Sequence, residues 1–230
     1  MKKFIGTKVI RAMSMTMVEA QKVLGREIKP ATKEDDGYLV EYKDGYKSWS
    51  PKSVFEEAYK PAETFLDRME TEYTTELDRY SKGKDFIDSV KFNELPTIVG
   101  AMLYAQNSIQ NEYLGLLKNR ICLAKNKPME NSLSFDVAIH LLKAGYAIRR
   151  AGWNGKGMFV IKQIPAHITG DIIPNMQSLP QSAKDILMKR ENPHIDYTNQ
   201  MLIVNPDGRA DSWVPSSSDV FAEDWEVAEN

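Results

Sequence analysis

The sequence predicts an α+β protein built from three segments. These are a small α+β module over residues 1–60, a helical hairpin over 61–127, and an α+β domain with an antiparallel sheet over 128–230. The first segment mixes strand alternation with turn residues, the second repeats apolar residues at helical spacing, and the third alternates short strands with glycine-containing turns. A chain of 230 residues has room for two or three small domains.

In the first segment, Gly37–Tyr42 alternate in the manner of a strand, and Asp44-Gly45 is a hairpin signal. Residues 50–58 have an early proline and then acidic residues, which predicts the start of a capped helix. Residues 13–24 predict a further short amphipathic helix, which Gly25 ends.

The middle segment repeats apolar residues every three or four positions. Its first helix carries Phe65, Met69, Tyr73, Leu77 and Tyr80 on one face, and residues 88–96 predict a hinge that ends in Leu95-Pro96. The second helix carries a longer set: Ile98, Met102, Ala105, Ile109, Tyr113, Leu116 and Ile121.

Two helices cannot enclose a core of their own, so the apolar stripe of the hairpin must be buried elsewhere. We expect it to be covered by other copies of the chain, which predicts a homo-oligomer. Packing of the stripe against flanking parts of the same chain is the alternative.

The third segment begins with a predicted linker over residues 127–131. Ser134 then predicts the cap of a helix that Gly145 closes. The remaining expected elements are strands at 146–149, 158–163 and 201–204, a loop-rich insert over about 165–200, a turn at 205–208, a helical turn capped by Ser216–Asp219, and a last segment Trp225–Val227.

Composition excludes several classes of protein. The chain contains no run of about 18 apolar residues, so we expect no membrane span, and its start, with Lys2 and Lys3, does not resemble a secretory signal. The single cysteine, Cys122, cannot form an intramolecular disulfide and suits a reducing cytoplasm. A net charge of −2 argues against coating of long nucleic acid, yet it is compatible with a small phosphate ligand held by a few donors.

Catalytic patterns are poorly represented. The three histidines, His140, His167 and His194, lack metal-ligand spacing, and Cys122 has no partner nearby in the sequence. The standard nucleophile-elbow, phosphate-loop and dinucleotide patterns are also missing. We therefore expect no catalytic residues, no metal and no cofactor.

Binding chemistry concentrates in residues 149–159. Glycines there allow backbone N–H groups to approach a phosphate, and Arg149, Arg150 and Lys156 supply charge-assisted hydrogen bonds. Trp153 offers a face on which a purine can stack, worth roughly 1–3 kcal/mol per base. A tight hairpin with a packing tryptophan is an equally good interpretation of this turn.

Two further groups are candidates for ligand contact. Trp213 could form a two-sided aromatic clamp with Trp153, although each ring alone is more often a core anchor. Along the first helix of the hairpin, cations lie near aromatic residues at helical spacing and could hold a bis-phosphate ring, or could simply be a solvated face; they are Arg68, Arg79, Lys82 and Lys84, with Phe65 and Tyr80 near them.

The third segment resembles the second Thoeris anti-defence family of phage proteins. The matching motifs are Gly152-Trp153-Asn154-Gly155-Lys156-Gly157-Met158-Phe159, Asp207-Gly208, Trp213-Val214-Pro215-Ser216 and Asp219-Val220-Phe221-Ala222-Glu223-Asp224-Trp225-Glu226. The resemblance implies a homotetramer that sequesters cyclic ADP-ribose isomers without degrading them. It implies pocket positions at Trp153, Asn154, Lys156, Phe159, Trp213 and Asp219. The chain departs from the family in its longer insert over 165–200, which contains Pro174, Pro180 and Pro193.

The middle segment is similar to the anti-CBASS sponges for cyclic oligonucleotides, which are small helical hexamers. The matching residues are Phe65, Arg68, Met69, Glu72, Lys82, Phe86-Ile87, Phe92, Leu95-Pro96, Leu103, Gln106, Tyr113, Leu116-Leu117 and Arg120-Ile121. The resemblance implies cyclic di- and trinucleotide ligands, with Phe65, Arg68, Arg79 and Lys82 as contact residues. Arg79 replaces what is usually lysine, and Gly83 stands where the family prefers an apolar residue.

These observations lead to one expected function, a phage sponge in the cytoplasm of an infected bacterium that binds cyclic nucleotide immune signals and does not cleave them. A tetramer or a hexamer is expected from the two resemblances. An enzyme that hydrolyses such signals is one alternative, and a phage protein-interaction adaptor without a small-molecule ligand is another. Residues 1–60 carry no assigned ligand.

Overall fold

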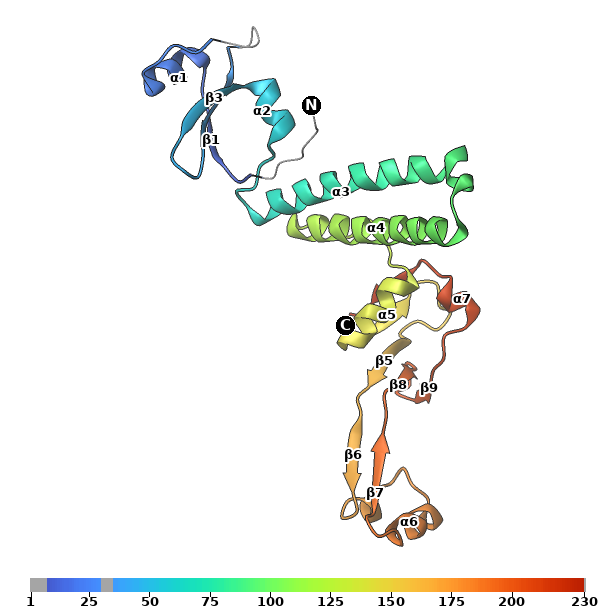
Figure 1. Cartoon of the computed structure of the whole chain (residues 1–230). Helices are drawn as coiled ribbons and strands as arrows, with labels where there is room; N and C mark the ends of the chain where they lie inside the picture. The colour runs from blue at the N-terminus through green and yellow to red at the C-terminus, as the bar shows by residue number, and fades with distance from the viewer. Residues whose placement is uncertain (1–7, 30–34, 230) are drawn as a thin grey trace. The chain divides into compact units, whose positions relative to one another are not determined.

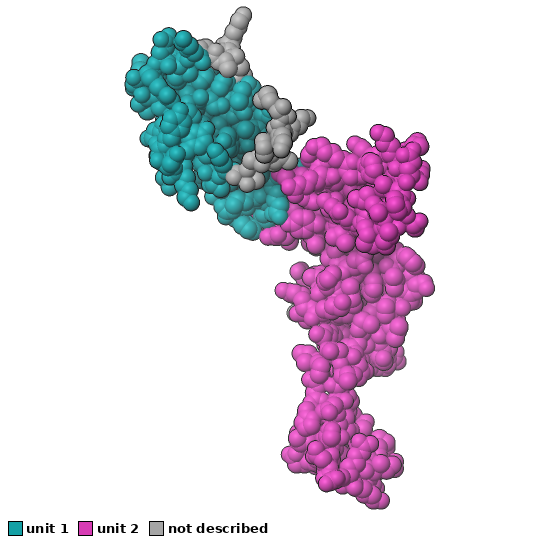
Figure 2. Space-filling model, viewed as in Figure 1, with its two compact units in different colours: residues 1–74 teal, residues 75–230 magenta. Residues whose placement is uncertain are grey.

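The computed structural model describes residues 8–29 and 35–229. The chain divides into two compact units, residues 1–74 and 75–230, which are coloured separately in Figure 2. Helices and antiparallel sheets occur together, so the predicted α+β class is confirmed. The division into three segments stays a prediction.

The N-terminal module is a three-stranded antiparallel sheet with two short helices. The strand order is β1-β2-β3. Trp49 packs so closely on Gly37 that a Cβ at that glycine would lie 2.5 Å from the indole ring, which explains why glycine is required there. The elements are β1 (Arg11–Ser14), α1 (Met17–Leu24), β2 (Gly37–Glu41), β3 (Lys47–Pro51) and α2 (Lys52–Ala58), which confirm the expected strand, hairpin turn and second helix (Figure 1). The capped, acidic start expected over residues 50–58 is wrong, because Pro51 provides no side-chain hydrogen bond and the first turn of α2 has no acidic residue.

The helix expected over residues 13–24 was placed too early. Met13 and Ser14 belong to β1, whose residues pair with β2. The helix starts only after Thr16, where Thr16 and Glu19 cap each other's backbone N–H groups in a capping box. Gly25 ends the helix in the left-handed conformation, as the sequence predicts.

The helical hairpin is confirmed. It consists of α3 (Phe65–Ile87), the short 3₁₀ helix η1 (Val90–Glu94) and α4 (Thr97–Ala124). The Asn107 side chain of α4 donates a hydrogen bond of 2.9 Å to the carbonyl of Tyr80 on α3. A Cβ at Gly83 would lie 2.7 Å from the same amide nitrogen. Glycine therefore stands at position 83 because it lets Asn107 reach the neighbouring helix.

The apolar stripe of α4 is buried along only part of its length. Leu117 and Ile121 are buried, and Leu116 packs against the C-terminal core. Ile98, Met102 and Ile109 are each more than half exposed. One half of the stripe is thus covered within the chain, and the other half is open in the single copy.

The linker expected over residues 127–131 is fixed to α4. The Asn119 side chain is buried, and its oxygen accepts hydrogen bonds from the backbone N–H groups of Glu130 and Asn131. Its amide nitrogen donates to the carbonyl of Asn131 at 2.8 Å. Cys122 is buried nearby, and this burial raises the pKa of its thiol above the usual range.

The C-terminal domain is a five-stranded antiparallel sheet with strand order β10-β4-β5-β8-β9. Helix α5 (Phe135–Ala144) begins after the Ser134 cap, ends at Gly145 as expected, and shares one core cluster with the sheet and Trp225. The other elements are β4 (Ile148–Arg150), β5 (Phe159–Gln163), β8 (Gln200–Val204), β9 (Ala210–Ser212), α7 (Ser217–Val220) and β10 (Trp225–Val227).

The insert over 165–200 is more regular than the loop that the sequence suggested. Strands β6 (Ala166–Thr169) and β7 (His194–Tyr197) pair in an antiparallel ribbon. Between them lie η2 (Ile173–Asn175) and α6 (Gln181–Met188), and Figure 1 shows α6 at the end of the ribbon. Two of the prolines in the insert are compatible with helical structure, because Pro180 directly precedes α6 and Pro174 lies inside η2.

The described residues include no helix that is both long and apolar enough to cross a membrane.

Candidate ligand-binding sites

The first candidate site is the glycine-rich turn between β4 and β5. It borders a cleft of about 280 Å³. Gly157 has φ of +86°, a conformation that favours glycine over other residues. The cleft is lined by Arg149, Arg150, Ala151, Trp153, Gly155, Lys156, Gly157, Met158 and Glu226. The predicted cation-bearing turn therefore does open onto a concave surface.

Asp224 holds the start of this turn in place. One carboxylate oxygen accepts the backbone N–H of Gly152 at 2.8 Å, and the other accepts the Arg150 Nε–H at 2.7 Å. A Cβ at Gly152 would lie 2.5 Å from the Asp224 carboxylate. The glycine thus allows a backbone-to-carboxylate contact that fixes the direction of the turn.

Asp219 holds the turn from its other side. Its Oδ1 accepts hydrogen bonds from Arg150 Nη1 at 3.1 Å and from Trp153 Nε1 at 3.3 Å. Its Oδ2 accepts the backbone N–H and the hydroxyl of Ser216, which forms the predicted cap of α7. Asp219 is only 7% exposed. Both carboxylate oxygens are therefore engaged inside the chain.

The protonation of this network follows from its contacts. Burial raises the pKa of Asp219, but the hydrogen bonds from Ser216, Arg150 and Trp153 outweigh burial and hold this pKa below its ordinary value. The hydrogen bond from Arg150 lowers the pKa of Asp224, and the same bond raises the pKa of Arg150. The network is ionised at neutral pH.

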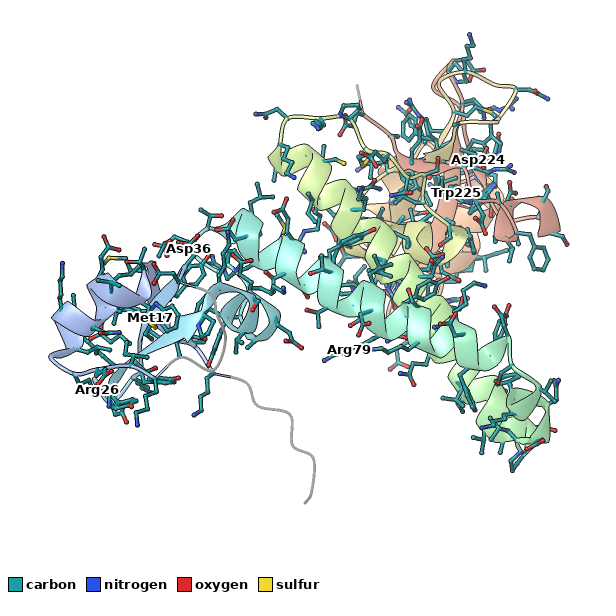
Figure 3. All side chains as sticks on the ribbon, turned by 90° about the horizontal axis from the view of Figure 1, so that it is seen from above. Met17, Arg26, Asp36, Arg79, Asp224 and Trp225 are labelled. Carbon is teal, nitrogen blue, oxygen red and sulfur yellow. The ribbon has the colours of Figure 1, made fainter. Side chains whose placement is uncertain are left out.

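The expected two-sided aromatic clamp is wrong for the single chain. Trp153 and Trp213 contact each other edge to face, with ring centres 6.3 Å apart at 70°. Both also pack edge to face on the fully buried Trp225, which Figure 3 labels beside Asp224. A base inserted between two rings needs them parallel and separated. The two tryptophans are instead partly buried and pack against the core.

The other predicted residues of this domain are distributed around the turn. Asn154 and Lys156 are exposed, and Lys156 has no hydrogen-bond or ion-pair partner within the described residues. Ile148 pairs with Val160, so by strand alternation Phe159 lies on the same sheet face as Arg149, opposite to the core. The structure thus brings Lys156 to the cleft and places Phe159 on the adjoining outer face.

The second candidate site is a cleft of about 290 Å³ between α3 and α4. It presents aromatic rings, amides, a hydroxyl and a cation, which together can stack on a base and hydrogen-bond to it. Its lining residues are Tyr80, Lys84, Ile87, Asp88, Tyr104, Asn107, Ser108 and Asn111.

Of the cations predicted to bind ligand on α3, Lys84 lines this cleft, where it pairs with Asp88 at 3.4 Å. Arg68, Arg79 and Lys82 lie outside the lining. Arg79 pairs with Glu76 at 3.4 Å, and Lys82 pairs with Asp78 at 2.5 Å. Near the start of the helix, Arg68 donates hydrogen bonds to the carbonyls of Ala62 and Glu63, and Phe65 is more than half exposed. The lining of the cleft between α3 and α4, as formed by the described residues, includes none of Phe65, Arg68, Arg79 and Lys82.

Sequence reasoning did not single out the α4 wall of this cleft. A signal was present, because Asn107, Ser108 and Asn111 interrupt the apolar pattern of α4 at positions one and four residues apart. Polar residues on the side of a helix that faces its partner indicate a local hydrogen-bonding role.

Both candidate sites fall within stretches that match known families. Residues 133–228 match a Tad2-like model. This model is described as the Thoeris anti-defense 2-like domain. A second stretch, residues 63–123, matches the model of the Sequestin family. A similar protein is "Thoeris anti-defense 2" of Bacillus phage SP01, which is 29% identical over 99 residues, covering 43% of this chain and 98% of the relative. Both resemblances inferred from the sequence are confirmed.

Each of the two matched stretches contains one of the candidate sites. The Tad2-like stretch contains the glycine-rich turn, its cleft and the Asp219–Arg150–Asp224 network. The Sequestin stretch contains the cleft between α3 and α4. Each stretch therefore has a concave surface of its own.

Proposed function

We propose that this protein is a phage anti-defence sponge that binds and sequesters cyclic nucleotide signals without cleaving them, in the cytoplasm of an infected bacterium. The Tad2-like stretch would take cyclic ADP-ribose isomers, and the Sequestin stretch would take cyclic di- and trinucleotides. The proposal is supported by the two family matches in one chain and by the name of the phage relative.

The observation that carries the proposal is the fixed, cation-bearing turn over the cleft. Its start is hydrogen-bonded to Asp224, and its exposed end presents Lys156, which has no partner among residues 8–29 and 35–229. Backbone N–H groups and a lysine that are already in place can bind a phosphate at little ordering cost. Tight capture of a signal needs such pre-organisation, because a sponge acts by affinity and not by turnover.

The candidate residues take two kinds of role in this proposal. Asn154, Lys156 and Phe159 would contact the ligand, because they lie at the cleft or on the adjoining face. Asp219 and Trp213 would act indirectly, since both hold Trp153 in its position. Trp153 would contact the ligand through the part that lines the cleft.

A second copy is needed to complete the site. The cleft of about 280 Å³ lies at the lower limit of ordinary ligand pockets, which span about 300–1,000 Å³. Val214 and Phe221 are 79% and 85% exposed in the same domain. We infer that these apolar residues meet another subunit in a homo-oligomer, a tetramer or a hexamer, whose surface closes over the ligand.

Binding without cleavage agrees with the chemistry around the cleft. Hydrolysis would need a free general base or nucleophile beside the ligand. Three carboxylates at the turn, within the described residues, are engaged in ion pairs: Asp219 and Asp224 with Arg150, and Glu226 with Arg149 at 2.6 Å. The site therefore offers donors and stacking surface to a ligand.

The test is calorimetry of the full chain with cyclic ADP-ribose isomers, followed by mass spectrometry of ligand released by denaturation. We expect binding, recovery of intact ligand, and at least a tenfold loss of affinity in Lys156→Ala. Lys189→Ala, which removes an exposed lysine next to α6, is the matched control and should bind like the parent chain.

Hydrolysed ligand would indicate an enzyme, and the absence of binding would favour an adaptor without a small-molecule ligand. Equal affinity of Lys156→Ala and the parent chain would show that the turn is not the site. Trp153→Ala is a poorer test, because it also removes the contacts of this partly buried ring with Trp213 and Trp225 and so lowers stability.

A further inference from the structure

A row of aromatic and cationic side chains lies at the β2–β3 turn of the N-terminal module, outside both matched stretches. Tyr42 and Tyr46 flank this turn, and the Tyr42 N–H donates to the Tyr46 carbonyl at 2.9 Å. Gly45 has φ of +82° and closes the turn between them. The two rings are 5.8 Å apart with an angle of 32° between their planes, so the tight turn holds them side by side.

A cation lies against each of these rings. The Lys8 ammonium is 5.7 Å from the centre of the Tyr42 ring, and the Arg26 guanidinium is 5.7 Å from the centre of the Tyr46 ring. Arg26, labelled in Figure 3, also donates to the Tyr46 hydroxyl at 3.1 Å and to the Lys47 carbonyl at 3.3 Å. Because Arg26 follows the Gly25 cap of α1, the fold itself sets its position.

Open hollows of about 760 and 500 Å³ adjoin the row and share part of their lining. Together they add Arg11 and Lys43 to the cations of the surface. Two carboxylates are also present, but Glu41 pairs with Lys47, and Asp44 accepts the backbone N–H of Tyr46. The remaining cations, Lys8, Arg11 and Lys43, have no carboxylate partner in residues 8–29 and 35–229.

The charge of this module differs from that of the whole chain. Residues 1–60 contain twelve Lys and Arg against nine Asp and Glu, whereas the chain as a whole has a net charge of −2. The net charge of the chain therefore averages over a positive module and a more acidic remainder. An electrostatic argument about nucleic acid applies to each module separately.

We propose that this surface binds a short stretch of linear single-stranded nucleic acid. Lys8, Arg11 and Lys43 contact successive phosphates, and a base stacks on Tyr46, which is 54% exposed. An open surface with spaced cations and aromatic rings suits a strand that passes across it, whereas a small ligand is normally enclosed. The module would thereby bring the sponge to nucleic acid, a function separate from capture of cyclic signals.

The experiment is fluorescence anisotropy of the full chain with labelled 12-nucleotide oligothymidylate and oligoadenylate, over a range of salt concentrations. Each neutralised phosphate of a single strand contributes a slope of about −0.7 in log affinity against log salt. Lys8→Glu with Lys43→Glu should lower affinity at least tenfold and make the slope less steep by about 1.4. Lys22→Glu with Lys52→Glu, at exposed sites on α1 and α2, changes the net charge equally and should lower affinity less than twofold.

A second pair of variants tests the ring itself. Tyr46→Leu should weaken binding several-fold, while Tyr46→Phe, which keeps the aromatic face, should bind nearly as well as the parent chain. Failure to bind either strand, an equal loss in both charge-reversed pairs, or equal affinities of Tyr46→Leu and the parent chain would each overturn the proposal.

Discussion

The glycine-rich turn and the cation-bearing face of α3 are stabilised in opposite ways. At the glycine-rich turn, Arg150 is held between Asp219 and Asp224, and the side chains of Arg150 and Asp219 are 19% and 10% exposed. On α3, Arg79 and Lys82 pair with carboxylates of the same helix, and their side chains are 67% and 73% exposed. The first site is fixed inside one chain, whereas the ion pairs of the second are surface features.

This difference indicates which site has its side chains held in place before a second subunit completes it. Removal of one member of a buried, hydrogen-bonded pair leaves an uncompensated charge, whereas an exposed pair contributes little. The hairpin also leaves Ile98, Met102 and Ile109 uncovered. We infer that the turn is pre-organised in the monomer and that the hairpin site reaches its final form on self-association.

The largest effect is expected from breaking the network at the turn. Asp219→Ala removes the acceptor of Arg150 and Trp153 together with one half of the α7 capping box, and should destabilise the C-terminal domain by about 3 kcal/mol. Urea unfolding followed by tryptophan fluorescence measures this loss, because Trp153, Trp213 and Trp225 form one cluster. Asp211→Ala, which removes the exposed pair with Arg209 and an exposed hydrogen bond from Asn205, should cost less than about 1 kcal/mol. Similar losses of unfolding free energy in the two variants would contradict the inferred difference between the buried network and the exposed ion pairs.

A large effect on assembly, but not on folding, is expected from the open half of the α4 stripe. Ile109→Glu places a charge where we infer a subunit contact, and should raise the dissociation constant of the oligomer more than a hundredfold. Sedimentation velocity and native mass spectrometry report the change, and circular dichroism checks that the helices persist. Ser182→Glu on α6 adds the same charge to an exposed helix position and should assemble normally. A parent chain that is monomeric at every concentration would refute the inference.

A smaller effect is expected from pH. The folded-state pKa values of Asp219 and Asp224 lie below the ordinary range, so their stabilising effect is present above about pH 4 and is lost as the pH falls through the folded values. Asp219→Asn keeps a capping side chain but cannot ionise. The difference in unfolding free energy between the parent chain and Asp219→Asn should therefore narrow below about pH 4. A difference that is independent of pH would mean that the charge of Asp219 contributes nothing.

Local signals in the sequence predicted most elements of the fold. Ser134 with Gly145, Ser216 with Asp219, and Pro96 before α4 are each determined by neighbouring residues, and each is confirmed. The start of α1 was missed because apolar residues from Met13 onward continue the helical pattern, while pairing with β2 draws Met13 and Ser14 into β1. Pairing across the chain overrides local propensity there.

The sites were predictable only in part. The glycine-rich turn could be predicted as a binding element, because its glycines, its cations and Trp153 are adjacent in the sequence. Its support was not, since Asp224 and Asp219 lie about 70 residues away from Arg150 and are brought to it by the pairing of β10 with β4. The cleft between α3 and α4 was missed for the same reason: Tyr80 and Asn107 belong to different helices, and only the hairpin brings them together.

The smallest effect on stability is expected on the exposed face of α3, where it separates a binding role from a structural one. Arg79→Ala with Lys82→Ala should change the unfolding free energy by less than about 1 kcal/mol, since both cations are exposed and pair within their own helix. If these cations contact the phosphates of a cyclic dinucleotide, calorimetry should show a several-fold loss of affinity in the same variant, while Lys91→Ala, at an exposed position in η1, binds normally. A loss of stability above 1 kcal/mol would make the cations structural, and unchanged affinity would transfer the site to the cleft lined by Tyr104 and Lys84. Because stability and affinity are measured on the same variant, the two results together show whether the cyclic nucleotide contacts the exposed cations of α3 or the cleft between α3 and α4.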